Sequence, residues 1–177
     1  GVRKTYLIHG ITGSGKTEVY IHLLKTVIAA GRQAIVLIPE ISLTFQTVSR
    51  FRAAFGERVA VMHSRLSDGE RYDQYERAKN GEVDIMVGPR SALFTPFEKL
   101  GIIIMDEEHE TSYISEGAPR YHSDEVAKYR AGLAGASVVF GSATPSVKSY
   151  LAAKDGRYKQ YRLTKRTGDA GLPAIHT

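Results

Sequence analysis

The stretch that decides the fold is residues 5–17, Thr-Tyr-Leu-Ile-His-Gly-Ile-Thr-Gly-Ser-Gly-Lys-Thr. The apolar run from Tyr6 to Ile8 predicts a buried strand, and the segment that opens at Lys16 has the apolar spacing of an amphipathic helix. Between them, residues 10–17 fit the pattern G-x-x-x-x-G-K-[ST] at every fixed position. A strand, a loop and a helix in this order form the setting that a phosphate-binding loop requires. The stretch therefore predicts a nucleoside triphosphate site.

The chemistry of this loop follows from its residue types. Glycines allow tight turns that bring backbone N–H groups onto phosphate oxygens, and the start of the helix adds its positive end. Lys16 is expected to reach the β- and γ-phosphates and to assist catalysis, while the hydroxyl of Thr17 is expected to bind Mg²⁺. The predicted nucleotide-binding residues are Thr12, Gly13, Ser14, Gly15, Lys16 and Thr17.

Composition limits the class of protein. With 177 residues, 42% of them hydrophobic and 24% charged, the chain can bury the core of one globular domain. The absence of cysteine excludes disulfides and cysteine-ligated zinc within these residues. Neither a secretory signal nor an apolar run of membrane-spanning length is present, so we expect a soluble, cytoplasmic protein without a membrane partner.

The net charge of +5 is unevenly distributed. Arginines recur through residues 50–77 and basic residues through 154–166, whereas residues 106–125 between them are acidic. Basic segments that flank an acidic centre suit a polyanion-binding surface beside a metal site. Solvated helix faces would give a similar pattern, so charge alone leaves both interpretations open.

Predicted strands alternate with predicted helices along the chain. This order predicts an α/β domain with a largely parallel central sheet. Local signals place one helix between an N-cap at Thr44 and a stop at Gly56, and another after the capping-box pattern Ser67-Asp-Gly-Glu70. Residues 108–122 are expected to be irregular. We predict a domain over residues 1–163 and a linker over residues 164–177.

A second group of chemically active residues follows the apolar run Ile102–Met105. Phosphoryl transfer needs an acid near Mg²⁺ and a group that activates the attacking water. We expect Asp106 to hold the metal through its waters and Glu107 to act as the base. A kinase often needs only the aspartate, whereas a hydrolase needs a group such as Glu107. Gly141-Ser-Ala-Thr144 follows another predicted strand, at the carboxyl end where open α/β sheets bind ligands.

The phosphate-binding loop, Asp106-Glu-x-His109 and Ser142-Ala-Thr144, in this order, resemble the first RecA-like lobe of superfamily 2 helicases. Segments between these motifs are similar to the PriA family of replication-restart DNA helicases. They are Ile38–Thr44, His63-Ser64, Leu66–Tyr72, Gly88–Ala92 and Gly117–His122. The resemblance implies a RecA-like P-loop NTPase domain with helices on both faces of its sheet. It also implies ATP and Mg²⁺ as cofactors and 3′-to-5′ unwinding of single-stranded or forked DNA. Primosome proteins that restart replication at stalled forks are the implied partners.

The same resemblance assigns roles residue by residue. His109, Ser142 and Thr144 would couple the nucleotide state to DNA binding. Pro39, Glu40, Gly88, Arg90 and Ser91 match segments that contact the DNA backbone, although Pro89 stands where relatives usually have threonine. Tyr113, Tyr121 and His122 match a loop that senses single-stranded DNA, and aromatic rings suit base stacking. Packing of these rings against the domain is an equally weighted alternative.

The resemblance also implies parts outside these residues. They are a second lobe with an arginine finger, a cysteine-rich zinc region and N-terminal DNA-binding domains. An isolated lobe is then expected to bind nucleotide weakly and to hydrolyse it poorly. Two other functions remain open at this point: a P-loop kinase or regulator of small molecules, and a module that docks DNA or partner proteins without turnover. The first leaves Glu107, His109 and Ser142–Thr144 without a role.

Overall fold

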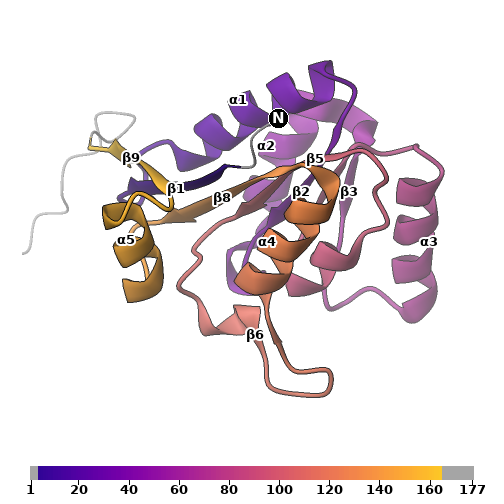
Figure 1. Cartoon of the computed structure of the whole chain (residues 1–177). Helices are drawn as coiled ribbons and strands as arrows, with labels where there is room; N and C mark the ends of the chain where they lie inside the picture. Colours follow the sequence, from indigo (N-terminus) through magenta and orange to yellow (C-terminus); the bar gives the residue numbers. More distant parts are fainter. Residues whose placement is uncertain (1–3, 165–177) are drawn as a thin grey trace, which may run out of the picture.

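The computed structural model describes residues 4–164, which form a seven-stranded main sheet flanked by helices and a small two-stranded hairpin (Figure 1). The strands of the main sheet are β1 (Thr5–Gly10), β2 (Gln33–Leu37), β3 (Val59–Val61), β4 (Ile85–Gly88), β5 (Leu100–Met105), β8 (Ser137–Ser142) and β9 (Lys159–Leu163). The α-helices are α1 (Lys16–Ala29), α2 (Phe45–Phe55), α3 (Asp68–Lys79), α4 (Ser123–Ala134) and α5 (Val147–Lys154). Short 3₁₀ turns span Glu40–Ser42, Gly56–Arg58, Arg90–Phe94 and Thr111–Tyr113.

The seven strands lie in the order β3-β4-β2-β5-β8-β1-β9, and every neighbouring pair is parallel. The predicted α/β class with a largely parallel sheet is therefore confirmed. In a parallel sheet all carboxyl ends meet at one edge. The loops after β1, β5 and β8 meet at that edge, and the loops after β2 and β4 lie beside them.

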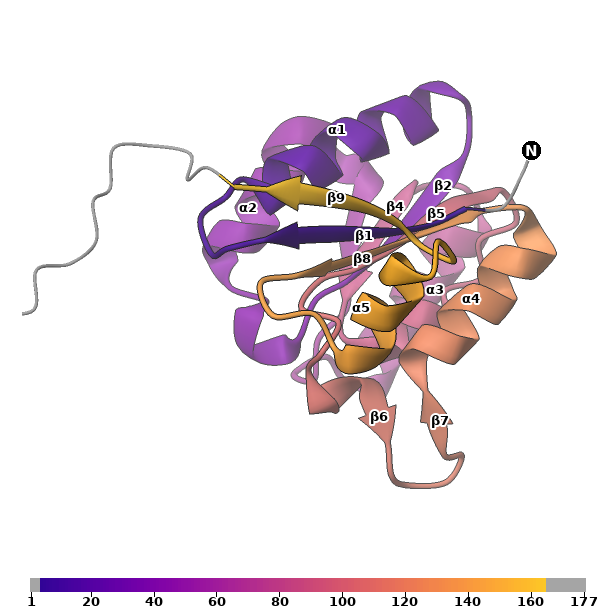
Figure 2. The ribbon, with the colours of Figure 1, turned by 60° about the vertical axis from the view of Figure 1, so that its left-hand side comes forward.

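Helices cover both faces of the sheet, as predicted (Figure 2). Alternate strand residues point to opposite faces, and this divides the core into two clusters. Ile35, Leu37 and Phe140 pack with residues of α3, α4 and α5 on one face. Val36 and Ile104 pack with Tyr20, Leu24 and Phe51 of α1 and α2 on the other. The central strands are buried on both faces, which explains their uninterrupted apolar sequence.

The predicted helix ends agree with the structure. The hydroxyl of Thr44 accepts a hydrogen bond from the backbone N–H of Thr47 at the start of α2, and Gly56 ends this helix. Ser67 and Glu70 form the reciprocal capping box of α3. These signals act between neighbours in the sequence, so they could be recognised without knowledge of the fold.

The region predicted to be irregular, residues 108–122, contains a small antiparallel hairpin and needs correction. Its strands are β6 (Ile114–Ser115) and β7 (Tyr121–His122), paired between Ile114 and His122 and between Ser115 and Tyr121. The hairpin projects from the body of the domain in both ribbon views (Figures 1 and 2). Two-residue strands are too short to leave an alternating pattern in the sequence, which is why periodicity missed them.

Two expectations concern the ends and the surroundings of the domain. All but the first residue of the predicted linker 164–177 lies outside the described residues. Within residues 4–164, none of the helices combines the length and the apolar character that crossing a membrane requires.

Candidate active site

The phosphate-binding loop joins β1 to α1 as the sequence predicted. Gly13 and Gly15 have φ angles of 78° and 85°, a region that glycine enters without steric cost. Gly15 is the N-cap of α1, and no side chain among the described residues caps the first turn of this helix. The positive end of α1 therefore faces the loop, as an anion-binding helix start requires.

Lys16 is held at the base of this loop. Its side chain is 8% exposed, and Nζ donates a hydrogen bond of 2.9 Å to the carbonyl oxygen of Gly10. Nζ also lies 3.4 Å from Oε1 of Glu107. The ammonium is thus placed between the end of β1 and the acidic loop after β5, although Glu107 lies 91 residues further along the chain.

A single hollow of about 410 Å³ contains the predicted nucleotide and acid residues. It is lined by Ile11, Thr12, Gly13, Gly15, Lys16, Thr17, Glu18, Arg50, Asp106 and Glu107. Ser14 is buried behind the loop, and its hydroxyl finds no hydrogen-bond partner among the described residues. Mg²⁺ prefers oxygen ligands, and Thr17 and Asp106, which carry a hydroxyl and a carboxylate, both line this same hollow. These residues fit a nucleoside triphosphate with its metal.

Asp106 is fixed by a residue that the sequence did not identify. The phenol of Tyr20, on α1, donates a hydrogen bond of 2.7 Å to Oδ1 of Asp106. The two side chains meet above Gly141 of β8, where a Cβ atom would lie 1.7 Å from Oη of Tyr20. Glycine at this position therefore makes room for the contact between α1 and the acid. Burial raises the pKa of Asp106, and the hydrogen bond from Tyr20 opposes this shift.

The raised pKa of Asp106 has a consequence for stability. In the folded state Asp106 holds its proton to higher pH than in the unfolded chain, where an aspartate pKa is about 3.9. The stability that follows from this raised pKa is fully present below the unfolded-state pKa of about 3.9. It is lost as pH rises through the folded-state pKa of Asp106. We expect Asp106→Asn to unfold at a higher urea concentration than wild type at pH 7. The difference should shrink as the pH is lowered toward about 4, the unfolded-state value.

Asp124 supplies a control of opposite sign. Burial raises its pKa, but hydrogen bonds from Lys148 and Lys128 outweigh burial and lower it. A lowered pKa contributes stability above the unfolded pKa that is lost as pH falls through the folded pKa. Asp124→Asn should therefore reduce the urea midpoint at pH 7. A reduced midpoint for Asp106→Asn as well would contradict the assignment for Asp106.

Glu107 has an unusual backbone conformation. Its φ angle is 47°, in the left-handed region that non-glycine residues rarely adopt. Strained backbone of this kind often accompanies functional sites. Here the turn directs the carboxylate toward Lys16 and His109, with Oε2 of Glu107 lying 3.7 Å from Nδ1 of His109.

The three residues expected to couple nucleotide and DNA lie together. Nδ1 of His109 is 2.7 Å from the hydroxyl of Ser142, and Nε2 is 3.5 Å from the hydroxyl of Thr144. The hydroxyl of Ser142 also accepts a hydrogen bond from the backbone N–H of Thr144. The loop after β5 and the loop after β8 are therefore joined through polar side chains beside Glu107.

Glu108 makes a second link between these loops that the sequence did not reveal. Its carboxylate accepts hydrogen bonds from the backbone N–H and hydroxyl of Ser146, at 2.7 and 3.0 Å. The hydroxyl of Ser149 donates a third hydrogen bond of 3.0 Å. Glu108 thus caps the start of α5, where a carboxylate is electrostatically favoured. No local signal could have indicated a contact across 38 residues.

A second hollow, of about 320 Å³, lies at the carboxyl ends of β2 and β4. It is lined by Pro39, Glu40, His63, Ser64, Arg71, Pro89, Arg90, Ser91, Ser112 and Tyr113. Five of the predicted DNA-binding residues are among these, and Gly88 ends the strand that leads to them. His63, Ser64 and Arg71 were not predicted as site residues, although all three lie in segments that resemble the helicase family.

Glu40 organises this second hollow. Its Oε1 accepts a hydrogen bond of 2.7 Å from the backbone N–H of Ser64, and hydrogen bonding to Ser64 keeps the pKa of Glu40 below its usual value. Nη2 of Arg71 donates to the carbonyl oxygen of Ser64 at 3.0 Å. The loop after β2 is thereby tied to the loop after β3, with a guanidinium beside it.

Arg90 and Tyr113 connect this hollow to the acidic loop. Nη1 of Arg90 donates hydrogen bonds of 3.0 and 2.7 Å to the carbonyl oxygens of Ser112 and Ile114. Between them, the hydroxyl of Tyr113 donates a hydrogen bond of 2.7 Å to the carbonyl oxygen of Asp106. Tyr113 is only 3% exposed. Of the two interpretations left open for this ring, stacking on DNA and packing against the domain, its burial favours packing.

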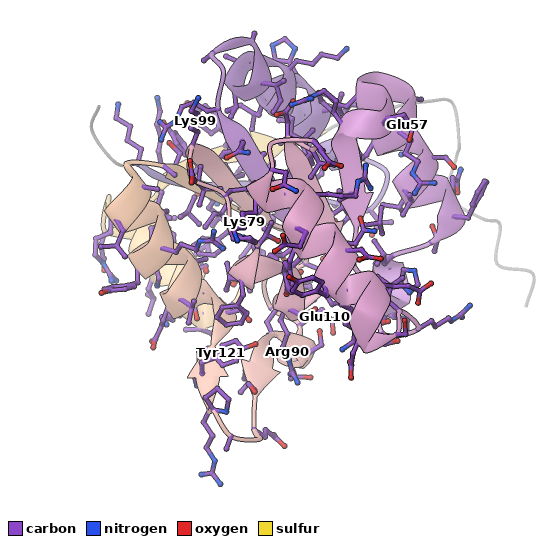
Figure 3. The ribbon with its side chains drawn as sticks, turned by 90° about the vertical axis from the view of Figure 1, so that its right-hand side faces the viewer. Glu57, Lys79, Arg90, Lys99, Glu110 and Tyr121 are labelled. Atoms are coloured by element: carbon purple, nitrogen blue, oxygen red, sulfur yellow. The ribbon has the colours of Figure 1, made fainter. Side chains whose placement is uncertain are left out.

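Tyr121 and His122 lie apart from this hollow. They line a separate depression of about 640 Å³ formed by the hairpin and the start of α4. The ring of Tyr121 packs edge-on against Phe94, with 5.4 Å between ring centres, whereas His122 is exposed. Figure 3 shows Arg90 and Tyr121 at the end of the domain that carries the hairpin.

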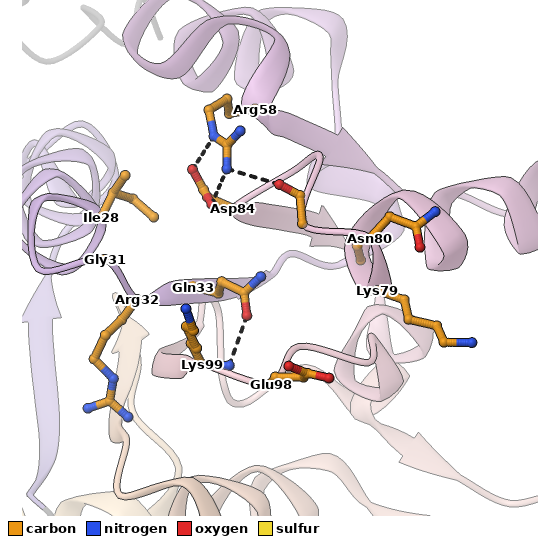
Figure 4. Close-up of a pocket in the computed structure, with 12 residues that line it drawn as sticks. Ile28, Gly31, Arg32, Gln33, Arg58, Lys79, Asn80, Asp84, Glu98 and Lys99 are labelled. Carbon is orange, nitrogen blue, oxygen red and sulfur yellow. Dashed lines mark hydrogen bonds and ion pairs between the residues drawn. The ribbon is translucent and has the colours of Figure 1, made fainter.

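A hollow of about 490 Å³ at the amino ends of the strands has a different character (Figure 4). Arg58 bonds to the carboxylate of Asp84 there, and Arg32 bonds to the carbonyl oxygens of Leu100, Ala134 and Gly135. The guanidinium groups of Arg32 and Arg58 are therefore used in contacts within the protein. Within residues 4–164 no cluster of three or more histidine, cysteine, aspartate or glutamate residues could hold a metal ion.

Comparisons with known proteins agree with this geometry. The family model described as DEAD/DEAH box helicase matches residues 2–152. The chain is 52% identical over 172 residues to the replication restart protein PriA of Bacillus subtilis, covering 97% of this chain and 21% of that protein. It is 48% identical over 167 residues to the replication restart protein PriA of Chlamydia pneumoniae, covering 94% and 22%. The chain thus spans about a fifth of the length of these curated relatives.

Solved structures show the same fold at lower identity. The helicase domain of Pyrococcus furiosus Hef superposes with a TM-score of 0.67 at 18% identity, covering 93% of this chain and 35% of that one. RecG bound to a three-way DNA junction gives a TM-score of 0.66 at 22% identity, covering 94% and 21%. The predicted RecA-like arrangement is thereby confirmed.

Proposed function

Because the chain belongs to the DEAD/DEAH box helicase family, we propose that it is the ATP-binding lobe of a DNA helicase that restarts replication at stalled forks. The observation that carries the proposal is the single hollow that contains the phosphate-binding loop, Asp106 and Glu107, with Lys16 and Glu107 only 3.4 Å apart. Relatives named replication restart protein PriA support the process in which it acts.

ATP hydrolysis in this site requires that the phosphates be held and that a water be activated. Backbone N–H groups at the start of α1 and the ammonium of Lys16 would hold the phosphates. Thr17 and Asp106 would hold Mg²⁺, which supplies charge neutralisation for the phosphates when bound. Glu107 would take the proton from the attacking water as the water oxygen forms a bond to the γ-phosphorus. The bond from the γ-phosphorus to the oxygen that bridges it to the β-phosphate would break, and ADP and inorganic phosphate would leave.

The effect of DNA binding would be transmitted to the nucleotide site through Tyr113. The second hollow, with Arg71 and Arg90, suits a phosphate backbone because guanidinium groups pair well with phosphate oxygens. Arg90 holds the backbone on either side of Tyr113, and Tyr113 bonds to the carbonyl of Asp106. Movement of Arg90 toward a phosphate would therefore displace the residue that supports the acidic loop. His109, Ser142 and Thr144 would extend this coupling to the loop after β8.

The wider setting forms part of the proposal. Single-stranded or forked DNA is the substrate, unwound in the 3′-to-5′ direction, and primosome proteins are the partners in the cytoplasm. A second lobe would close the cleft and provide the transition-state arginine. Zinc belongs, in this proposal, to the cysteine-rich region outside the chain. Exposed His122 and the edge-packed Tyr121 would contact bases at the hairpin.

The proposal is tested by ATP hydrolysis in the longer protein that carries this lobe, with and without single-stranded DNA. We expect DNA to accelerate hydrolysis. The Arg90→Ala variant should need about tenfold more DNA for half-maximal acceleration, because it loses one charged hydrogen-bonding contact. Arg157→Ala is the matched control, because Arg157 is exposed and pairs only with Asp155 among the described residues. A hydrolysis rate that is the same with and without DNA would overturn the proposal.

A further inference from the structure

One wall of the nucleotide hollow comes from α2, which the phosphate-binding motif does not include. Arg50 of α2 lines this hollow together with the loop at the start of α1 and the carboxylates of Asp106 and Glu107. Within residues 4–164 the guanidinium of Arg50 has neither a hydrogen bond nor an ion pair. Other arginines near the carboxyl edge, such as Arg71 and Arg90, donate to backbone carbonyls. Arg50 is therefore a cation that faces the nucleotide site without a partner among the described residues.

The helix that carries Arg50 is firmly placed. Its first turn is capped by Thr44 and its last turn ends at Gly56. The neighbouring Phe51 is fully buried in the core between α2 and the sheet. With Phe51 fixed, the side chain of Arg50 leaves the helix about 100° away, a geometry that follows from 3.6 residues per turn. Arg52 leaves on a different side, is exposed and does not line the hollow.

The topology shows from which side Arg50 approaches. Helix α2 follows β2, and β2 pairs directly with β5, the strand that ends one residue before Asp106. The phosphate-binding loop follows β1, which is separated from β5 by β8. Arg50 thus enters the hollow from the side of the carboxylates. Glu107 must face the γ-phosphate if it activates the attacking water, so this side of the hollow receives the terminal phosphate.

Charge supports the same assignment. The ammonium of Lys16 is held by Gly10 and Glu107, whereas Arg50 retains its donors for a ligand. A guanidinium presents paired N–H groups that match the oxygens of a phosphate. We propose that Arg50 contacts the terminal phosphate of the bound nucleoside triphosphate, and that it distinguishes ATP from ADP within this lobe. This inference rests on the proposed function, because it requires a triphosphate in the hollow.

Calorimetric titration of the 177-residue chain with MgATP, MgADP and magnesium tripolyphosphate tests the inference. The Arg50→Ala substitution should lower the affinities for MgATP and for magnesium tripolyphosphate about tenfold, because it removes one charged hydrogen-bonding contact. MgADP affinity should change less than about twofold, and Arg50→Lys should retain part of the ATP affinity. Arg52→Ala, with the same loss of charge on the same helix, should leave all three affinities unchanged.

Two results would overturn the inference. One is an Arg50→Ala variant that binds MgATP as tightly as Arg52→Ala does. The other is an equal loss for MgATP and MgADP with tripolyphosphate unaffected, which would place Arg50 on the nucleoside. In either case, wild-type binding that is lost in Lys16→Ala would leave the proposed function intact. Absence of MgATP binding by the wild-type chain would instead overturn the proposed function and this inference together.

Discussion

Replacing Glu107 with glutamine is expected to lower the rate of ATP hydrolysis by about a hundredfold to ten-thousandfold, the usual contribution of a general base. Glutamine has the same shape but cannot take the proton from the attacking water. Its amide can still occupy the space beside Lys16, so MgATP affinity should change only a few-fold. The measurement is the DNA-saturated turnover rate of the longer protein that carries this lobe, with affinity measured separately.

Glu110→Gln is the matched control for this substitution. Glu110 lies three residues further along the same acidic loop but does not line the nucleotide hollow. Its carboxylate is 3.9 Å from Nε2 of His109, a long and partly exposed contact. We expect its turnover rate to stay close to that of wild type. A Glu107→Gln protein that retains wild-type turnover would show that another group activates the water.

Replacing Lys16 with alanine is expected to have the second large effect, on nucleotide affinity. The substitution removes a buried ammonium that faces the phosphate site and leaves Glu107 without its cation. Charged hydrogen bonds contribute about 1.5–3 kcal/mol each, so the loss of this one should weaken MgATP binding by at least about tenfold. Repulsion between Glu107 and the phosphates adds to the loss. Calorimetry of the isolated 177-residue chain measures the change.

Lys25→Ala provides the control for charge and helix. Lys25 lies on the same helix, α1, but is exposed and does not line the nucleotide hollow. The Lys25→Ala variant should bind MgATP as the wild-type chain does. The Lys25→Ala and Lys16→Ala variants should show the same helical content. A comparable loss of affinity in Lys25→Ala would point to net charge rather than to a specific contact.

Much of the fold could be predicted because its signals act between near neighbours. The cap at Thr44 and the capping box at Ser67 join residues three apart in the chain. The uninterrupted apolar run that ends at Met105 predicts a strand covered on both faces. The acid loop follows directly, so its place at the carboxyl edge of the sheet followed from the strand alone.

What the sequence left out are contacts between distant segments. Tyr20 reaches Asp106 across 86 residues, and only the absence of a side chain at Gly141 allows this. Glu108 caps α5, and Arg50 joins the nucleotide hollow, through the order of the strands rather than through a motif. That order, β3-β4-β2-β5-β8-β1-β9, is not encoded in periodicity.

The burial of Tyr113 is another feature that the sequence alone could not decide. A tyrosine in a polar stretch was equally compatible with a stacking ring and with packing. Its 3% exposure and its hydrogen bond to Asp106 place it inside the domain. Only the folded structure places the hydroxyl of Tyr113 next to the backbone of Asp106. Composition therefore could not decide between the two interpretations.

We propose that residues 10–17 and the carboxylates after β5 form one nucleoside triphosphate site. Calorimetric titration of the wild-type chain and of Lys16→Ala with MgATP tests this proposal. We expect saturable one-to-one binding by the wild-type chain and an affinity at least about tenfold lower for the variant. Equal affinity of the two proteins, or no binding by either, would contradict it.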